Sequence, residues 1–103
     1  MRVMLKVNMP VEEGDKLAKA GKLEETIMGI LAEQKPEAVY FVANNGMRTA
    51  ILFIIINDSS EITKYCEPWF LATNVFIEMT PVMPPDDLEK GAPAIIAAAK
   101  KYG

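Results

Sequence analysis

The densest group of side chains suited to binding or acting on a small molecule lies between residues 65 and 70. Tyr65, Trp69 and Phe70 are aromatic, Glu67 supplies a carboxylate, and Pro68 interrupts the helical pattern on which they lie. A proline inside a helix removes one backbone hydrogen bond and bends the axis, and a bent helix packed on a sheet can leave a cleft. The segment therefore predicts an apolar pocket with Glu67 as a candidate acid or base. The structural alternative is an aromatic plug that closes the core.

Two further pairs of polar side chains fall in strands that we expect to be antiparallel neighbours. Lys6 and Glu78 have the same parity and so lie on the same face of the sheet, where their side chains are predicted to meet across the strand pair. They could serve as an acid or base, and the alternative is an ion pair that fixes the register of a dimer. Asn8 and Asn74 lie at one end of the same strands. They are candidates for hydrogen-bonding a ligand, and the alternative is that they satisfy turn backbone.

Three isolated residues complete the candidates. The Tyr40 phenol is a possible proton donor, although a packed strand residue is the simpler interpretation. Arg48 follows a predicted turn and is suited either to clamping a carboxylate or to standing in solvent. Cys66 has no histidine partner, so we expect a buried structural thiol rather than a nucleophile.

Composition excludes several kinds of chemistry. The chain has no histidine, the commonest general base and metal ligand, and its net charge of -3 offers no basic excess for nucleic acid. Its glycines form no phosphate-binding fingerprint. The acidic groups at residues 12–15 and 86–89 are better explained as charges at helix starts than as cation ligands. No metal and no cofactor are expected.

Length and hydropathy indicate one domain over residues 1–103 without a membrane span. The longest apolar run, Ala50 to Ile56, is far shorter than the roughly 20 residues of a spanning helix. No signal-peptide apolar region develops before Lys6 and Asn8, and the one cysteine cannot form an intrachain disulfide. A cytoplasmic location is the default expectation.

Hydrophobic periodicity predicts the elements that must position these residues. Strand patterns alternate with period two, helical patterns repeat at three and four residues, and Asn45-Gly46 favours a tight hairpin turn. A serine at 59 or 60 is expected to cap a helix that Pro68 kinks or restarts, and Gly91 and Pro93 are expected to divide the last helix. The predicted strands are 2–9, 38–43, 47–56 and 74–83, and the predicted helices are 11–20, 22–34, one from about residue 60, and a closing segment from Pro84.

This order predicts an α+β fold, the ferredoxin-like βαββαβ sandwich with an extra C-terminal helix. Its antiparallel sheet has the order 4-1-3-2, with the helices on one face. The second and third strands are apolar on both parities, so the face away from the helices is apolar too. Because a chain of this length has no spare segment to cover that face, we expect a homodimer.

Residues 2–83 resemble the dimeric α/β-barrel superfamily, in which two ferredoxin-like subunits pack their sheets together into a joint barrel. The segments Glu67–Phe70 and Pro81–Leu88 resemble the tail of a small uncharacterised bacterial group within that superfamily. The resemblance implies a paired fold without fixing a chemistry. Its members include muconolactone-isomerase-like enzymes, cofactor-free monooxygenases, haem-handling and dye-decolourising enzymes, and ligand-sensing domains. Haem-handling members typically use a histidine, which this chain lacks.

Three functional hypotheses follow from the sequence, and they leave open whether the protein is an enzyme. The first is a dimeric protein that binds a small, largely apolar molecule in a cleft between sheet and helices, lined by Tyr40 and the aromatic residues of 65–70. The second is a cofactor-independent isomerase or monooxygenase with Glu78 or Glu67 as base and Tyr40 or Asn74 orienting the substrate. The third is a homodimer with a purely structural role.

Overall fold

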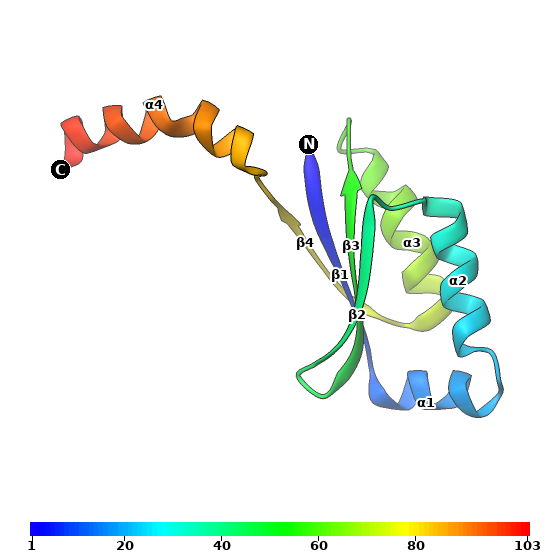
Figure 1. Cartoon of the computed structure of the whole chain (residues 1–103). Helices are drawn as coiled ribbons and strands as arrows, with labels where there is room; N and C mark the ends of the chain where they lie inside the picture. Colours follow the sequence, from blue (N-terminus) through cyan, green and yellow to red (C-terminus); the bar gives the residue numbers. More distant parts are fainter.

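A computed structural model describes residues 1–103, and it shows an α+β arrangement of four strands and four helices (Figure 1). Helices α1, α2 and α3 lie on one side of the sheet, and α4 extends away from it on the other side. In chain order the elements are β1 (Arg2–Met9), α1 (Val11–Lys19), α2 (Leu23–Gln34), β2 (Ala38–Asn44), β3 (Met47–Ile55), α3 (Glu61–Thr73), β4 (Phe76–Pro81) and α4 (Pro85–Tyr102).

The sheet has the predicted strand order. Its strands run β2-β3-β1-β4, which is 4-1-3-2 counted from the other edge, and every neighbouring pair is antiparallel. In β1, Leu5 pairs with Leu52 of β3 on one side and with Met79 of β4 on the other. This arrangement is compatible with the ferredoxin-like sandwich.

The core lies between the sheet and helices α2 and α3. Alternate residues of β1 and β3 point into it, as the period-two pattern predicts, and Leu5 and Leu52 have no exposed surface. Trp69 of α3 is 1% exposed and is the largest of the fully buried side chains. This helix-covered side of the sheet is called the core face below.

No helix covers the opposite side of the sheet, the open face. Several large apolar side chains lie there in solvent: Tyr40 is 61% exposed and Phe76 is 66% exposed. We define the open face by the residues that share their parity in the strand register, namely Arg2, Met4, Lys6, Asn8, Ala38, Tyr40, Val42, Asn44, Met47, Thr49, Ile51, Phe53, Ile55, Phe76, Glu78 and Thr80. Most of its apolar residues lie on β2 and β3, so the apolar second face expected of these two strands is present.

The turn between β2 and β3 has the predicted chemistry. Asn45 and Gly46 both have positive φ angles, of 52° and 77°. Two successive positive φ angles define the hairpin turn whose twist matches the strands, and asparagine and glycine adopt them at the lowest cost. The turn fixes the β2–β3 register.

Helix α3 begins differently from the prediction. Ser60 occupies the N-cap position but makes no side-chain cap hydrogen bond. The first two N–H groups of the helix, those of Glu61 and Ile62, donate instead to the carbonyls of Asp58 and Ser59 at 3.0 and 3.1 Å. The Glu61 carboxylate accepts hydrogen bonds from the backbone N–H groups of Asn57 and Asp58, at 2.6 and 3.1 Å, and so holds the turn that precedes the helix. The helix then runs as one element through Pro68, so of the two predicted alternatives, a kink or a restart, the restart does not occur.

Helix α4 is a single helix, and the predicted division at Gly91 and Pro93 is wrong. Pro93 lacks the N–H that would bond to the carbonyl of Glu89. Because Glu89 is exposed, water can satisfy that carbonyl and the helix continues. Pro85 occupies the first turn, where no N–H is needed.

No residue of α4 is buried, and the helix projects far from the sheet (Figure 1). The projection gives the chain a radius of gyration of 17.2 Å and extents of 59 × 27 × 20 Å. A compact chain of this length has a radius of gyration of about 13 Å. None of the four helices combines the length and hydropathy needed to cross a membrane.

Candidate functional site

The larger of the two main cavities lies beneath the β2–β3 hairpin, between the core face of the sheet and helices α1 and α2. Its volume is about 640 Å³, and eleven of its fifteen lining residues are hydrophobic. The lining comprises Val7, Met9, Val11, Asp15, Leu23, Ile27, Phe41, Val42, Ala43, Gly46, Met47, Arg48, Thr49, Ala50 and Trp69. A cavity of this size and composition is typical of sites for small molecules.

Small residues in the hairpin create this space. Ala43 and Ala50 carry the core-face parity of β2 and β3, where Leu52 and Ile54 fill the corresponding positions further along β3. Their methyl groups leave room between the hairpin and helices α1 and α2. Trp69 contributes to the wall from α3, and its indole Nε1 donates to Oε1 of Gln34 at 3.0 Å. This hydrogen bond holds the indole ring in place.

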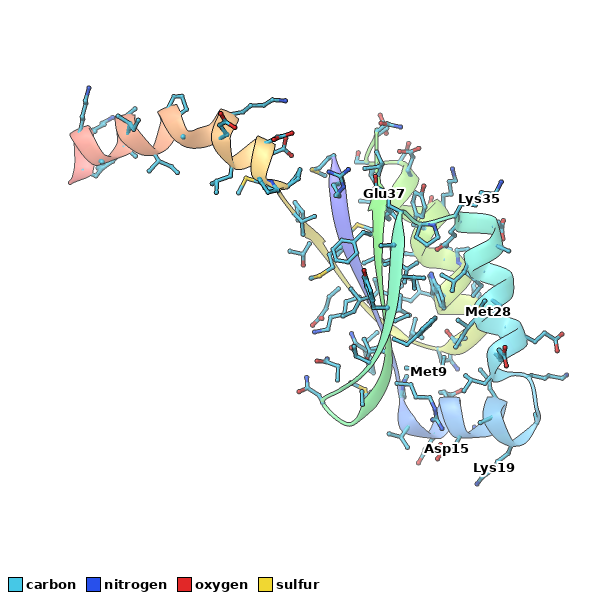
Figure 2. The ribbon with its side chains drawn as sticks, in the orientation of Figure 1. Met9, Asp15, Lys19, Met28, Lys35 and Glu37 are labelled. Carbon is cyan, nitrogen blue, oxygen red and sulfur yellow. The ribbon has the colours of Figure 1, made fainter.

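One ion pair supplies the charged part of the lining. Nη1 of Arg48 donates to Oδ1 of Asp15 at 3.0 Å, and both side chains are nearly half exposed. Asp15 lies on α1 (Figure 2), so the ion pair joins this helix to β3. The other N–H groups of the guanidinium have no acceptor within the chain, so they remain available to an anionic or carbonyl group of a ligand.

Gly14 makes the position of Arg48 possible. It is buried in α1, and a Cβ atom at this residue would lie only 2.6 Å from Nη1 of Arg48 and 3.1 Å from Sδ of Met9. Met9 and Asp15 are both labelled near α1 in Figure 2. The absence of a side chain at Gly14 therefore lets the guanidinium lie against α1 beside Asp15.

The structure does not gather the predicted aromatic cluster into one pocket. Trp69 lines the large cavity, but Tyr65, Glu67 and Phe70 line neither of the two main cavities. Trp69 is buried as the aromatic plug of the core, and Phe70 is 40% exposed. The cleft expected beside Pro68 is not one of these two cavities.

Three other predicted ligand residues lie apart from the cavity. Tyr40 is on the open face, on the opposite side of the sheet from the helices. Asn8 is 5% exposed and its amide oxygen accepts a hydrogen bond from Oγ1 of Thr49 at 3.1 Å. Asn74 ends α3 in the left-handed conformation, with a φ angle of 49°. Asn8 thus bonds to residues of neighbouring strands and Asn74 is the C-cap residue of α3, and neither lines one of the two main cavities.

The predicted pairing of Lys6 with Glu78 is confirmed. The two residues are register partners in β1 and β4, and Nζ of Lys6 lies 3.7 Å from Oε2 of Glu78 on the open face. Glu78 and Glu67, the two candidate bases of the isomerase hypothesis, line neither of the two main cavities of the single chain.

Cys66 is a buried thiol. Burial raises the pKa of Cys66, and the negative charge of Glu67 raises it further, so the thiol form is favoured. No three of the Cys, Asp and Glu side chains are grouped closely enough to hold a metal ion.

Sequence reasoning missed most of the cavity lining, because its residues come from β1, α1, α2, β2, β3 and α3. One local signal was available: alanines occupy two core-face positions beside the hairpin turn, whereas Leu52 and Ile54 occupy the core-face positions further along β3. Arg48 was considered as a carboxylate clamp, and its place in the lining is consistent with that hypothesis. Comparisons with protein-family models and with curated proteins give no match for this chain.

Proposed function

We propose that the protein is a homodimer that binds a small, largely apolar molecule in the cavity beneath the β2–β3 hairpin. The observation that carries this proposal is the cavity itself, about 640 Å³ of mainly hydrophobic lining with one tryptophan in its wall. Burying apolar ligand surface against such a lining contributes about 25 cal/mol per Å². The same observation weighs against a purely structural role, for which no internal space is needed.

The charged part of the lining determines which polar group the proposed ligand carries. Arg48 has N–H donors without acceptors in the chain, and Asp15 holds the guanidinium in one position. A bidentate contact to a carboxylate or a similar anion is the strongest bond that such a guanidinium makes. The proposed ligand therefore has an apolar body and one anionic or carbonyl group.

The pairing part of the proposal rests on the open face. Tyr40 and Val42 on the edge strand β2 are 61% and 41% exposed, and Phe76 on the opposite edge strand β4 is 66% exposed. Large apolar side chains exposed at both edges of one uncovered face favour an interface there. A second copy packed face to face is the simplest cover, because closed twofold pairs are the commonest assemblies of identical chains.

The ligand test uses 1-anilinonaphthalene-8-sulfonate, a fluorescent probe with an apolar body and one anionic group. Trp69 is the only tryptophan, so energy transfer from it reports probe bound to the chain, and the space-filling variants described next test whether that probe lies in the cavity. We expect saturable binding with one probe per chain, accompanied by quenching of Trp69. Substituting Arg48→Met should weaken binding at least about tenfold, through loss of a charge-assisted hydrogen bond.

A space-filling variant provides the sharper control. Ala43→Phe places a ring in the cavity from the edge strand β2, whereas Ala72→Phe adds the same ring to an exposed position of α3. The proposal requires that Ala43→Phe abolish the energy transfer and that Ala72→Phe leave it unchanged. Equal binding by both variants would refute the assignment of the cavity.

A further inference from the structure

Helix α4 carries an apolar stripe that nothing in the chain covers. Its residues recur at spacings of three and four, which places them on one side of the helix. Ile95 is 59% exposed, Ile96 58% and Tyr102 79%. We define the α4 stripe as Leu88, Ala92, Ile95, Ile96, Ala99 and Tyr102.

An isolated helix of this kind is marginal in water. It has 18 residues and contains Gly91 and Pro93. Helix nucleation is unfavourable, and glycine and proline cost about 1 and about 3 kcal/mol in a helix interior. Water can satisfy the carbonyl freed at Pro93, but packing of the stripe against another surface is needed to stabilise α4 as one continuous helix.

The start of α4 fixes its direction. The backbone N–H of Val82 donates to the carbonyl of Arg2 at 3.1 Å, so the chain stays attached to β1 just beyond β4. Pro84 and Pro85 follow and restrict the link. Figure 1 shows α4 leaving the sheet on the side away from α1, α2 and α3, which is the side of the open face. A second copy packed on that face lies alongside α4.

A matching surface exists on the edge of the chain opposite β4. Phe41 of β2 points to the core face but is 56% exposed, and Met28 of α2 is 53% exposed. Together with Leu23, Glu24 and Ile27 these residues line a second hollow of about 340 Å³, here called the edge groove. A concave apolar groove is the usual receptor for an amphipathic helix.

The dimensions and charges of the two surfaces agree. At 1.5 Å per residue α4 is about 27 Å long, enough to pass a partner's sheet about 10 Å away and reach its helical layer. Lys100 and Lys101 lie at the far end of α4, and Glu24 borders the groove, so the charges of the two surfaces are complementary.

The area that such a pair would bury is also close to that of a stable interface. A four-stranded face covers about 500 Å², and the arm and its groove bring the total towards the roughly 800 Å² per partner of a stable pair.

We infer that α4 is an arm that docks its stripe into the edge groove of a second copy of this chain. The pair sets the β4 edge of each copy beside the β2 edge of the other, and two arms are exchanged. Leu23, Ile27 and Phe41 line both the edge groove and the large cavity. The partner's arm therefore closes one side of the ligand cavity. This inference rests on the homodimer proposed above.

Disulfide trapping between two differently tagged full-length chains tests the arm. One chain carries Met28→Cys in the edge groove, and the other carries Ile96→Cys in the stripe. Cys66 is buried and stays in both. Because the two cysteines are on different chains, any bond between the tags is intermolecular. We expect rapid formation of the mixed species, since only side chains in contact have the short Cα separation that a disulfide needs.

The matched control replaces Ile96→Cys with Ala97→Cys, on the opposite side of α4. The inference predicts at least about tenfold less mixed product from this control, because its thiol points away from the groove. Equal yields from both mixtures would overturn it. The inference would also be overturned if a chain carrying both Met28→Cys and Ile96→Cys formed only an intrachain disulfide.

Sedimentation and probe binding separate this inference from the proposed function. Dimers that bind the naphthalene sulfonate but give no trapped product refute the arm and leave the proposed function standing. Dimers that trap at Met28 and Ile96 but bind no probe support the arm and refute the ligand proposal. A monomer under all conditions overturns both.

Discussion

Substituting Phe76→Asp should separate the proposed pair without unfolding the chain. Phe76 lies on the open face at the start of β4, opposite Asn8 in the register, and 66% of its surface is in solvent. A side chain this exposed contributes little to the fold of one chain, so its replacement should change that stability by less than about 0.5 kcal/mol. The substitution should instead weaken the association of the two copies.

The magnitude follows from the exposed area. A phenylalanine presents about 200 Å², so about 130 Å² of Phe76 is free to be buried by a partner. At about 25 cal/mol per Å² this burial contributes about 3 kcal/mol for each copy and about 6 kcal/mol for the pair. If pairing covers between half and all of the ring, the dissociation constant rises between about 100-fold and about 10⁴-fold.

Sedimentation equilibrium across a range of concentrations measures this shift. The matched control is Leu71→Asp on α3, which is 83% exposed but lies on the helical side of the sheet. The control should sediment as the unsubstituted protein does. A Phe76→Asp variant that keeps the parent dissociation constant would refute the argument that the open face is the interface.

Three further outcomes are expected. Gln34→Ala removes the buried acceptor of the Trp69 indole, and urea denaturation should show a loss of about 1–3 kcal/mol; an unchanged midpoint would contradict the role of that hydrogen bond. Backbone hydrogen bonds hold the pKa of Glu61 below its ordinary value of about 4.5, so its stabilisation is present at neutral pH and is lost as pH falls through the folded-state pKa. Thermal melts should therefore show that Glu61→Gln is less stable than the parent at pH 7 and equally stable in acid. A difference in stability that persists at pH 2 would contradict this role of the Glu61 carboxylate. Burial and the charge of Glu67 raise the pKa of Cys66, so alkylation by iodoacetamide at pH 8 should be at least about tenfold slower than that of a free thiol and faster in Glu67→Gln; a rate equal to the free thiol's would be the contrary result.

Much of the fold could be predicted because its signals are local. The alternation of Val3, Leu5 and Val7 identifies the core face of β1, and Asn45-Gly46 identifies the hairpin turn. Together with the crossover rule, these patterns lead to the observed strand order. Helix boundaries within a turn of the observed ones follow from the same periodicity.

The errors arose where solvent or a neighbouring backbone determines the outcome. Pro93 was expected to divide α4, but an exposed helix can satisfy the freed carbonyl with water. A serine was expected to cap α3, but the backbone carbonyls of Asp58 and Ser59 accept from the first N–H groups of the helix instead. Such competition between nearby acceptors cannot be read from residue type alone.

The site was harder to predict than the fold. Aromatic density at residues 65–70 favoured a pocket there, yet Trp69 fills the core and the open space lies beneath the hairpin. That space depends on the small side chains of Ala43 and Ala50 and on the positions of α1 and α2. Distances between elements, rather than the pattern within any one of them, decide where a cavity forms.

Native mass spectrometry of the purified protein, compared with the same sample under denaturing conditions, tests the central claim most directly. It reports pairing and a retained small molecule in one measurement. We predict a species of twice the 11.4 kDa chain mass, carrying an additional small mass that disappears on denaturation. A bare chain of 11.4 kDa under native conditions would contradict the account.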